Sequence, residues 1–114
     1  MGLSCEDKNN IQELDCLVKT KCFSSELNPV KKITNQDGII WFNNSQKNYA
    51  VYVGVSGSYD SQLVGIVCNL PKDFEMEGLE IIFSGFYYDY DKIVSDIILG
   101  QKYYYLELCE IKKK

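Results

Sequence analysis

The chain has 114 residues, sixteen acidic and twelve basic side chains, a formal charge of −4 and 46% hydrophobic residues. This length and composition predict one globular domain with a modest core, not a disordered or fibrous chain. There is no histidine, which excludes Ser-His-Asp and Cys-His catalysis and histidine metal sites. Every basic residue is a lysine, so there is no guanidinium fork for phosphate or guanine.

The first residues indicate a lipid anchor. Leu3-Ser4-Cys5 resembles the small-residue-then-cysteine cleavage site of bacterial lipoproteins, and an acidic, polar stretch follows it. No hydrophobic signal segment precedes Cys5, and no apolar run approaches the ~20 residues that span a membrane. We therefore expect residues 1–8 to be a flexible tether and Cys5 to carry the lipid in a longer precursor. The alternative is a terminal cysteine without a role.

The remaining cysteines form an even set, Cys16, Cys22, Cys68 and Cys109. In a small exported domain such a set predicts up to two disulfides, with three possible pairings. If the first two cysteines lie on a helix, they cannot face each other and pair with the last two; on a hairpin, they can pair together. Four buried thiols are the alternative, and the spacing does not match a zinc site.

Apolar residues at spacings of three and four predict a short helix over residues 9–23. A second, single helical turn is expected at residues 72–78, ending at Gly78. Alternating or continuous apolar runs between turn signals predict five strands, over residues 33–42, 49–55, 63–70, 79–86 and 103–111.

Several residues refine these predicted strands. Asp37-Gly38 is a turn dipeptide inside the first, and Pro71 ends the third. In the fourth, Leu79, Ile81 and Phe83 share one face, and Gly85 predicts a bulge or sharp bend.

Together these elements predict an all-β domain with a short N-terminal helix over residues 9–114. Sheets that close on themselves hide their edges, so we expect a small five-stranded OB-like barrel. A β-sandwich is the alternative.

Four stretches carry motifs in a fixed order: residues 57–61 (GSYDS), 68–74 (CNLPKDF), 78–85 (GLEIIFSG) and 100–108 (GQKYYYLEL). They resemble a family of small lipoproteins from Gram-negative gut bacteria, which share an NLP-x-x-F … GL-x-V-x-F-SG core. The resemblance spans residues 37–112. It implies an exported, lipid-anchored OB-like domain of unknown biochemical role, and it supplies no catalytic residues.

Nine tyrosines, five phenylalanines and one tryptophan indicate a binding surface. Tyrosine provides amphipathic contact area at low entropic cost, which suits contact with a protein or a glycan. Three of the tyrosines are expected to share the loop that starts the last long connection, at residues 87–91. The candidate contact residues are Trp41, Tyr59, Tyr87, Tyr88 and Tyr90. The strand tyrosines 103–105 are better explained as side chains that cover the core.

Other ligand classes find less support. Asp89 and Asp91 could contribute to a calcium site or an acid/base pair, but a solvated acidic loop is the simpler interpretation. The pI of about 4.8 and the scattered lysines disfavour nucleic acid. We expect no metal or other cofactor.

The sequence thus predicts a non-enzymatic, extracytoplasmic lipoprotein domain that binds a protein or a glycan. It is expected to be anchored in the outer membrane through Cys5, facing the periplasm or the cell surface. The alternative function is inhibition of a secreted protease through the loop at residues 57–61 or 87–91. A third is a hydrolase that uses carboxylates alone.

Overall fold

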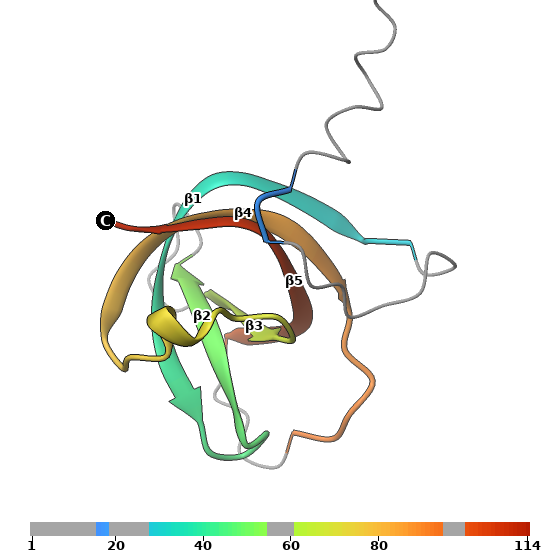
Figure 1. Ribbon diagram of the computed structural model, residues 1–114. Coiled ribbons are helices and arrows are strands. Elements are labelled where there is room, and N and C mark those ends of the chain that lie inside the picture. Colours follow the sequence, from blue (N-terminus) through green and yellow to red (C-terminus); the bar gives the residue numbers. More distant parts are fainter. Residues whose placement is uncertain (1–15, 19–27, 55–60, 95–99) are drawn as a thin grey trace, which may run out of the picture.

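The computed structural model describes residues 16–18, 28–54, 61–94 and 100–114, which build an all-β barrel (Figure 1). Its strands are β1 (Lys31–Asn43), β2 (Asn48–Gly54), β3 (Gln62–Val67), β4 (Leu79–Asp89) and β5 (Gln101–Lys113). A 3₁₀ turn, η1 (Lys72–Phe74), lies between β3 and β4. The predicted OB-like barrel is confirmed, and the β-sandwich is wrong because one sheet closes on itself.

The strands follow the order β1-β2-β3-β5-β4 around the barrel, and β4 pairs with β1 to close it. β3 and β5 run parallel, and the other neighbouring pairs are antiparallel. In Figure 1 the long strands β1, β4 and β5 arch over the shorter β2 and β3. A closed five-stranded sheet of this kind satisfies the strand edges internally.

Alternation along each strand fills the barrel with apolar side chains. In β4 the predicted inward face is confirmed, since Ile81 and Phe83 are buried and Leu79 packs against them. Tyr87 continues this face and stacks on Tyr104, with ring centroids 5.0 Å apart. The buried core consists of Ile40, Val51, Val53, Val67, Ile81, Phe83, Tyr87, Leu106 and Leu108.

A β-bulge lies in β5, opposite the glycine that was expected to bend the fourth strand. Ser84 pairs with Glu110 but Gly85 pairs with Leu108, so Cys109 is an extra residue in β5. A Cβ at Gly85 would lie 2.5 Å from a backbone carbonyl oxygen of β5, so only glycine fits there. The predicted irregularity is confirmed, and its extra residue belongs to the partner strand.

The predicted turn at Asp37-Gly38 is wrong, because both residues lie inside β1. Gly38 is needed for packing instead, since a Cβ there would lie 2.6 Å from Cγ1 of Val51. The bend in β1 comes earlier, at a bulge where Asn35 has a φ of 48°. Asparagine tolerates this left-handed backbone better than most residues do.

The link from β3 to β4 is held by side chains of the motif. The Oδ1 atom of Asn69 accepts the N–H of Leu108 (2.8 Å), and its Nδ2 atom donates to the Leu108 carbonyl oxygen (3.0 Å). Phe74 packs against the core from the end of η1. The predicted helical turn at residues 72–78 is confirmed in its first part, and Gly78 follows with a φ of 83°.

The predicted tether at residues 1–8 and most of the predicted helix at residues 9–23 lie outside the described residues. The described part of that helix, residues 16–18, is not helical. The backbone N–H of Val18 donates to the carbonyl oxygen of Cys109 (2.9 Å), so these three residues lie along β5.

Candidate binding surfaces

A disulfide joins residues 16–18 to the barrel. Cys16 and Cys109 are bonded across a sequence separation of 93 residues. Cys68 is disulfide-bonded as well, to a partner outside the described residues. Of the pairings left open, Cys16 with Cys109 is observed, which excludes Cys16 with Cys22. The helix on which a strand pairing was expected is not present at residues 16–18. Cys5 and Cys22 lie outside the described residues.

The predicted tyrosine loop is wrong, because β4 continues to Asp89 and includes Tyr87 and Tyr88. Tyr87 points into the barrel with no exposed surface, so it cannot touch a partner. Tyr88 points outward, partly exposed, and its hydroxyl donates to Oε1 of Glu107 (3.4 Å). Tyr59 lies outside the described residues.

Tyr90 holds the beginning of the β4–β5 connection against the barrel. Its hydroxyl donates to Oε1 of Gln46, in the turn between β1 and β2. The Nε2 atom of Gln46 donates to the carbonyl oxygen of Ile93 (3.1 Å), and its backbone N–H donates to Oδ1 of Asn43 (2.9 Å). The β1–β2 turn therefore clamps residues 90–94.

Asn43 extends this clamp into a buried layer on the outside of the barrel. Its Nδ2 atom donates to the hydroxyls of Tyr52 (2.9 Å) and Tyr103 (3.0 Å). Burial raises the pKa of Tyr52, although the hydrogen bond with Asn43 opposes the rise. Burial and then the nearby Tyr103 raise the pKa of Tyr90. The layer's buried residues are Ala50, Val64, Ile66 and Tyr103, against which Tyr52, Tyr90 and Val94 pack.

The clamped residues 90–94 lie on the side of the barrel where OB-folds commonly bind their ligands. OB-folds bind oligonucleotides and oligosaccharides on the face of strands 2 and 3, bordered by the 1–2 and 4–5 loops. Here Tyr90 and Val94 pack against the layer over β2, β3 and β5 and cover that face. Tyr90 and Tyr103 therefore serve the protein's own packing, and the hydroxyl of Tyr52 is held by Asn43.

The two candidate carboxylates have different environments. Asp91 accepts a hydrogen bond from the hydroxyl of Tyr105 at 2.6 Å. Partial burial, and then this bond to a carboxylate, raise the pKa of Tyr105 to about 12. Asp89 is exposed at the end of β4. Over the part of the chain that the structure describes, no three Cys, Asp or Glu side chains gather in a possible metal site.

Trp41 presents an aromatic ring to solvent from the outer side of β1, with 45% of the residue exposed. The ring lies over Gly78, where a Cβ would lie 3.5 Å from the indole. The N–H of Gly78 donates to the carbonyl oxygen of Ile40 (2.7 Å), and Glu77 accepts the N–H of Phe42 (3.1 Å). These bonds fix the turn beneath the indole, so the exposed ring has a firm base.

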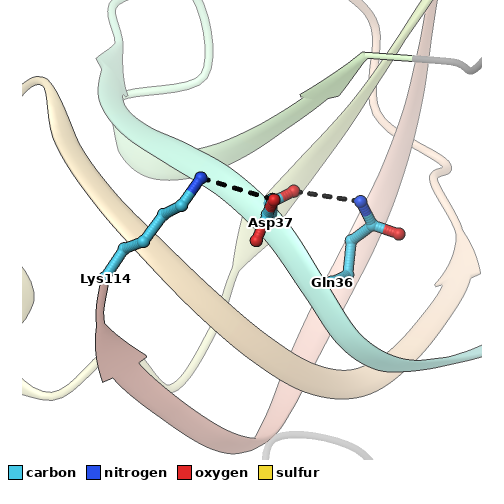
Figure 2. Close-up of polar contacts among 3 residues, drawn as sticks. All are labelled: Gln36, Asp37 and Lys114. Atoms are coloured by element: carbon cyan, nitrogen blue, oxygen red, sulfur yellow. Dashed lines mark hydrogen bonds and ion pairs between the residues drawn. The ribbon is translucent and has the colours of Figure 1, made fainter.

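A shallow groove of about 280 Å³ begins two residues away on the same side of β1. Ile39, 37% exposed, pairs with Tyr52 on β2 and with Glu80 on β4. Asp37 and Lys114 form an ion pair at the rim, with 3.4 Å between Oδ2 and Nζ. Figure 2 shows the Lys114 side chain reaching over β4 to Asp37 on β1.

We call Trp41 together with the groove residues the Trp41 surface. The groove residues are Asp37, Gly38, Ile39, Tyr52, Gly54, Glu80 and Lys114. Among the predicted contact residues that the structure describes, Trp41 belongs to it, and Tyr87, Tyr88 and Tyr90 do not. The sequence did carry a signal for Ile39: it alternates with Ile40, which is buried, and so shares the outward face of Trp41. Glu80 and Lys114 gave no such signal, because strand pairing alone brings them beside β1.

Comparison of the chain with protein-family models finds no match, and no curated protein matches it. Within the described ranges, no helix is both long and apolar enough to cross a membrane.

Proposed function

We propose that this chain is a non-enzymatic binding domain, tethered outside the cytoplasm by a lipid on Cys5, that contacts its partner through the Trp41 surface. The observation that carries the proposal is the indole of Trp41, 45% exposed on a strand paired on both sides. Exposed aromatic rings on firm supports are frequent anchors of binding surfaces.

The disulfides support the extracytoplasmic part of the proposal. Disulfides persist in oxidising compartments and are rare in the cytosol. The Cys16–Cys109 bond and the bonded Cys68 engage three of the five cysteines. A lipidated Cys5 would leave Cys22 as the remaining cysteine, so that the lipid and two disulfides would account for all five.

The contacts of the candidate carboxylates support a binding role over a hydrolytic one. Asp91 accepts a hydrogen bond from Tyr105, and Asp89 is exposed at the end of β4. The protease-inhibitor alternative loses one of its two loops, because residues 87–89 belong to β4. Its other loop, residues 57–61, lies mostly outside the described residues.

Binding of the labelled domain to cells of the natural source that lack this protein tests the proposal. The wild type should bind saturably, and Trp41→Ala should weaken binding about tenfold or more, as expected for an aromatic anchor worth about 1.4 kcal/mol or more. Ile93→Ala is the matched control, since Ile93 is 90% exposed outside this surface. Equal binding by all three proteins would refute a role for the Trp41 surface.

A further inference from the structure

We infer that the Trp41 surface binds an uncharged oligosaccharide of pyranose units; this inference rests on the proposed function. A pyranose ring has an apolar C–H face and a rim of hydroxyl groups. Its recognition therefore needs a flat apolar platform beside groups that accept and donate hydrogen bonds. The outer side of β1 holds both.

The platform consists of Trp41 and the groove floor. Ile39 and Trp41 are two residues apart on one strand, so their side chains stand side by side on one face. Tyr52, directly across from Ile39, adds a half-buried aromatic wall whose hydroxyl is already held by Asn43. If one sugar ring of the oligosaccharide lies on the indole, the next ring would lie over Ile39.

The polar groups stand on the groove rim. The carboxylates of Asp37 and Glu80 can each accept bonds from sugar hydroxyls, and the ammonium of Lys114 can donate. The ion pair of Asp37 with Lys114 is well exposed, with 63% and 48% of the side chains accessible. Exposed pairs contribute little to stability, so both groups can turn toward a ligand at small cost.

The size and charge of the surface favour this ligand over a protein. Stable protein interfaces need about 800 Å² and roughly 20–30 residues on each side. The Trp41 surface has Trp41 and seven groove residues. A rim that carries charges of both signs matches an uncharged ligand with hydroxyls that donate and accept. Since residues 90–94 cover the β2–β3 face, the sugar site lies instead across β4, β1 and β2.

Tryptophan fluorescence provides a direct test, because Trp41 is the only tryptophan in the chain. The full domain is titrated with hexasaccharides of β-1,4-glucan, β-1,3-glucan, α-1,4-glucan and β-1,4-mannan. At least one should shift the emission saturably. The double variant Asp37→Asn/Glu80→Gln keeps the reporter and should weaken binding about fivefold or more, as for one or more lost bonds to charged groups. The matched control is Asp89→Asn, an exposed carboxylate at the end of β4, which should bind as the wild type.

A panel without any response, or equal affinity of wild type and double variant, overturns the inference. A photoreactive benzophenone amino acid at position 39, used on cells of the natural source, then separates the two proposals. Protein adducts that Trp41→Ala abolishes would leave the proposed binding function standing with a protein ligand. Absence of both sugar response and adducts would overturn the proposed function as well.

Discussion

Asn69 completes a strand pairing with its side chain where the backbone of β3 has ended. Its amide makes two hydrogen bonds with the backbone of Leu108, and it is buried, with 7% exposed. Asn69→Ala would leave a buried N–H and a buried carbonyl unpaired, at about 1–3 kcal/mol each. We expect urea unfolding to show a loss of about 2–6 kcal/mol. Asn28→Ala, at an exposed position, should change stability little; an equal loss in both variants would contradict the account.

Tyr87 differs from Asn69, because its buried polar group is not hydrogen-bonded among the described residues. Among the described residues, its hydroxyl is a buried side-chain polar group without a hydrogen-bond partner, and burial raises its pKa. Tyr87→Phe removes that unsatisfied group and keeps the ring that stacks on Tyr104. We therefore expect unchanged or slightly higher thermal stability. A loss above about 1 kcal/mol would show that the hydroxyl has a partner, such as a buried water.

The motif residues show how far the sequence could lead. Gly78 and Gly85 were correctly expected at a turn and at an irregularity, because each follows from local backbone chemistry. The predicted strand end at Pro71 is wrong, since β3 ends at Val67. Asn69 looked like an interruption of a strand, since nothing local indicates that its amide pairs with Leu108, 39 residues away. Tyr87 resembled a loop tyrosine because the cluster around it is polar. Only pairing of β4 with both neighbours shows that it points inward.

At the scale of elements, the bulge in β5 and the disulfide coincide at Cys109. The bulge leaves Cys109 out of the regular pairing with β4, and it is bonded to Cys16. Closing a loop of this length is worth about 4.6 kcal/mol in the chain-entropy model. The variant Cys16→Ser/Cys109→Ser should lose about 2–4 kcal/mol in guanidinium unfolding under oxidising conditions. Under reducing conditions this difference from the wild type should shrink, and a difference that persists would point to packing rather than the bond.

Partial burial of Tyr105 on β5, and then its hydrogen bond to Asp91 in the β4–β5 connection, make the protein's stability depend on pH in the alkaline range. Tyr105 titrates near 12 in the folded protein against about 10 in an unfolded chain, so between these values the folded form binds more protons. The stability that Tyr105 contributes is therefore complete below pH 10 and is lost as the pH rises through about 12.

Asp91→Asn should lower the pKa of Tyr105, because it removes the carboxylate that disfavours tyrosinate. Ultraviolet titration of tyrosinate, with Tyr105→Phe as the reference that lacks this step, measures the change. An identical alkaline step in Asp91→Asn and wild type would show that burial alone raises the pKa.

The elements themselves were largely predictable, and their contacts were not. Periodicity located all five strands, with ends that moved by a few residues. The Trp41 surface depends on the pairing of β1 with β2 and with β4, which brings together Asp37, Tyr52 and Glu80. No local pattern specifies such register. The sequence therefore indicated aromatic contact residues, but two of the tyrosines it selected, Tyr87 and Tyr90, pack within the protein.

At the scale of the whole molecule, the residues that shape the barrel are largely different from those that form the Trp41 surface. The residues of the NLP-x-x-F and GL-x-V-x-F-SG motifs pack, turn or bend the barrel, as Asn69, Phe74 and Gly85 show. Of the Trp41 surface, only Glu80 falls within these motifs, so the residues that shape the barrel are largely separate from those of this surface.

The attachment of the domain is testable on the natural protein. If Cys5 carries a lipid, mass spectrometry of the protein extracted from cell envelopes should find an acylated cysteine at the mature N-terminus. Cys5→Ala should move the protein from the membrane pellet to the soluble fraction. A lipidated Cys5 requires that Cys68 is bonded to Cys22, and in that case the fold should not change, because neither disulfide then uses Cys5. An unmodified Cys5 in envelope-associated protein would mean that membrane attachment, if any, comes from a partner. The binding role of the Trp41 surface would then have to operate without a tether.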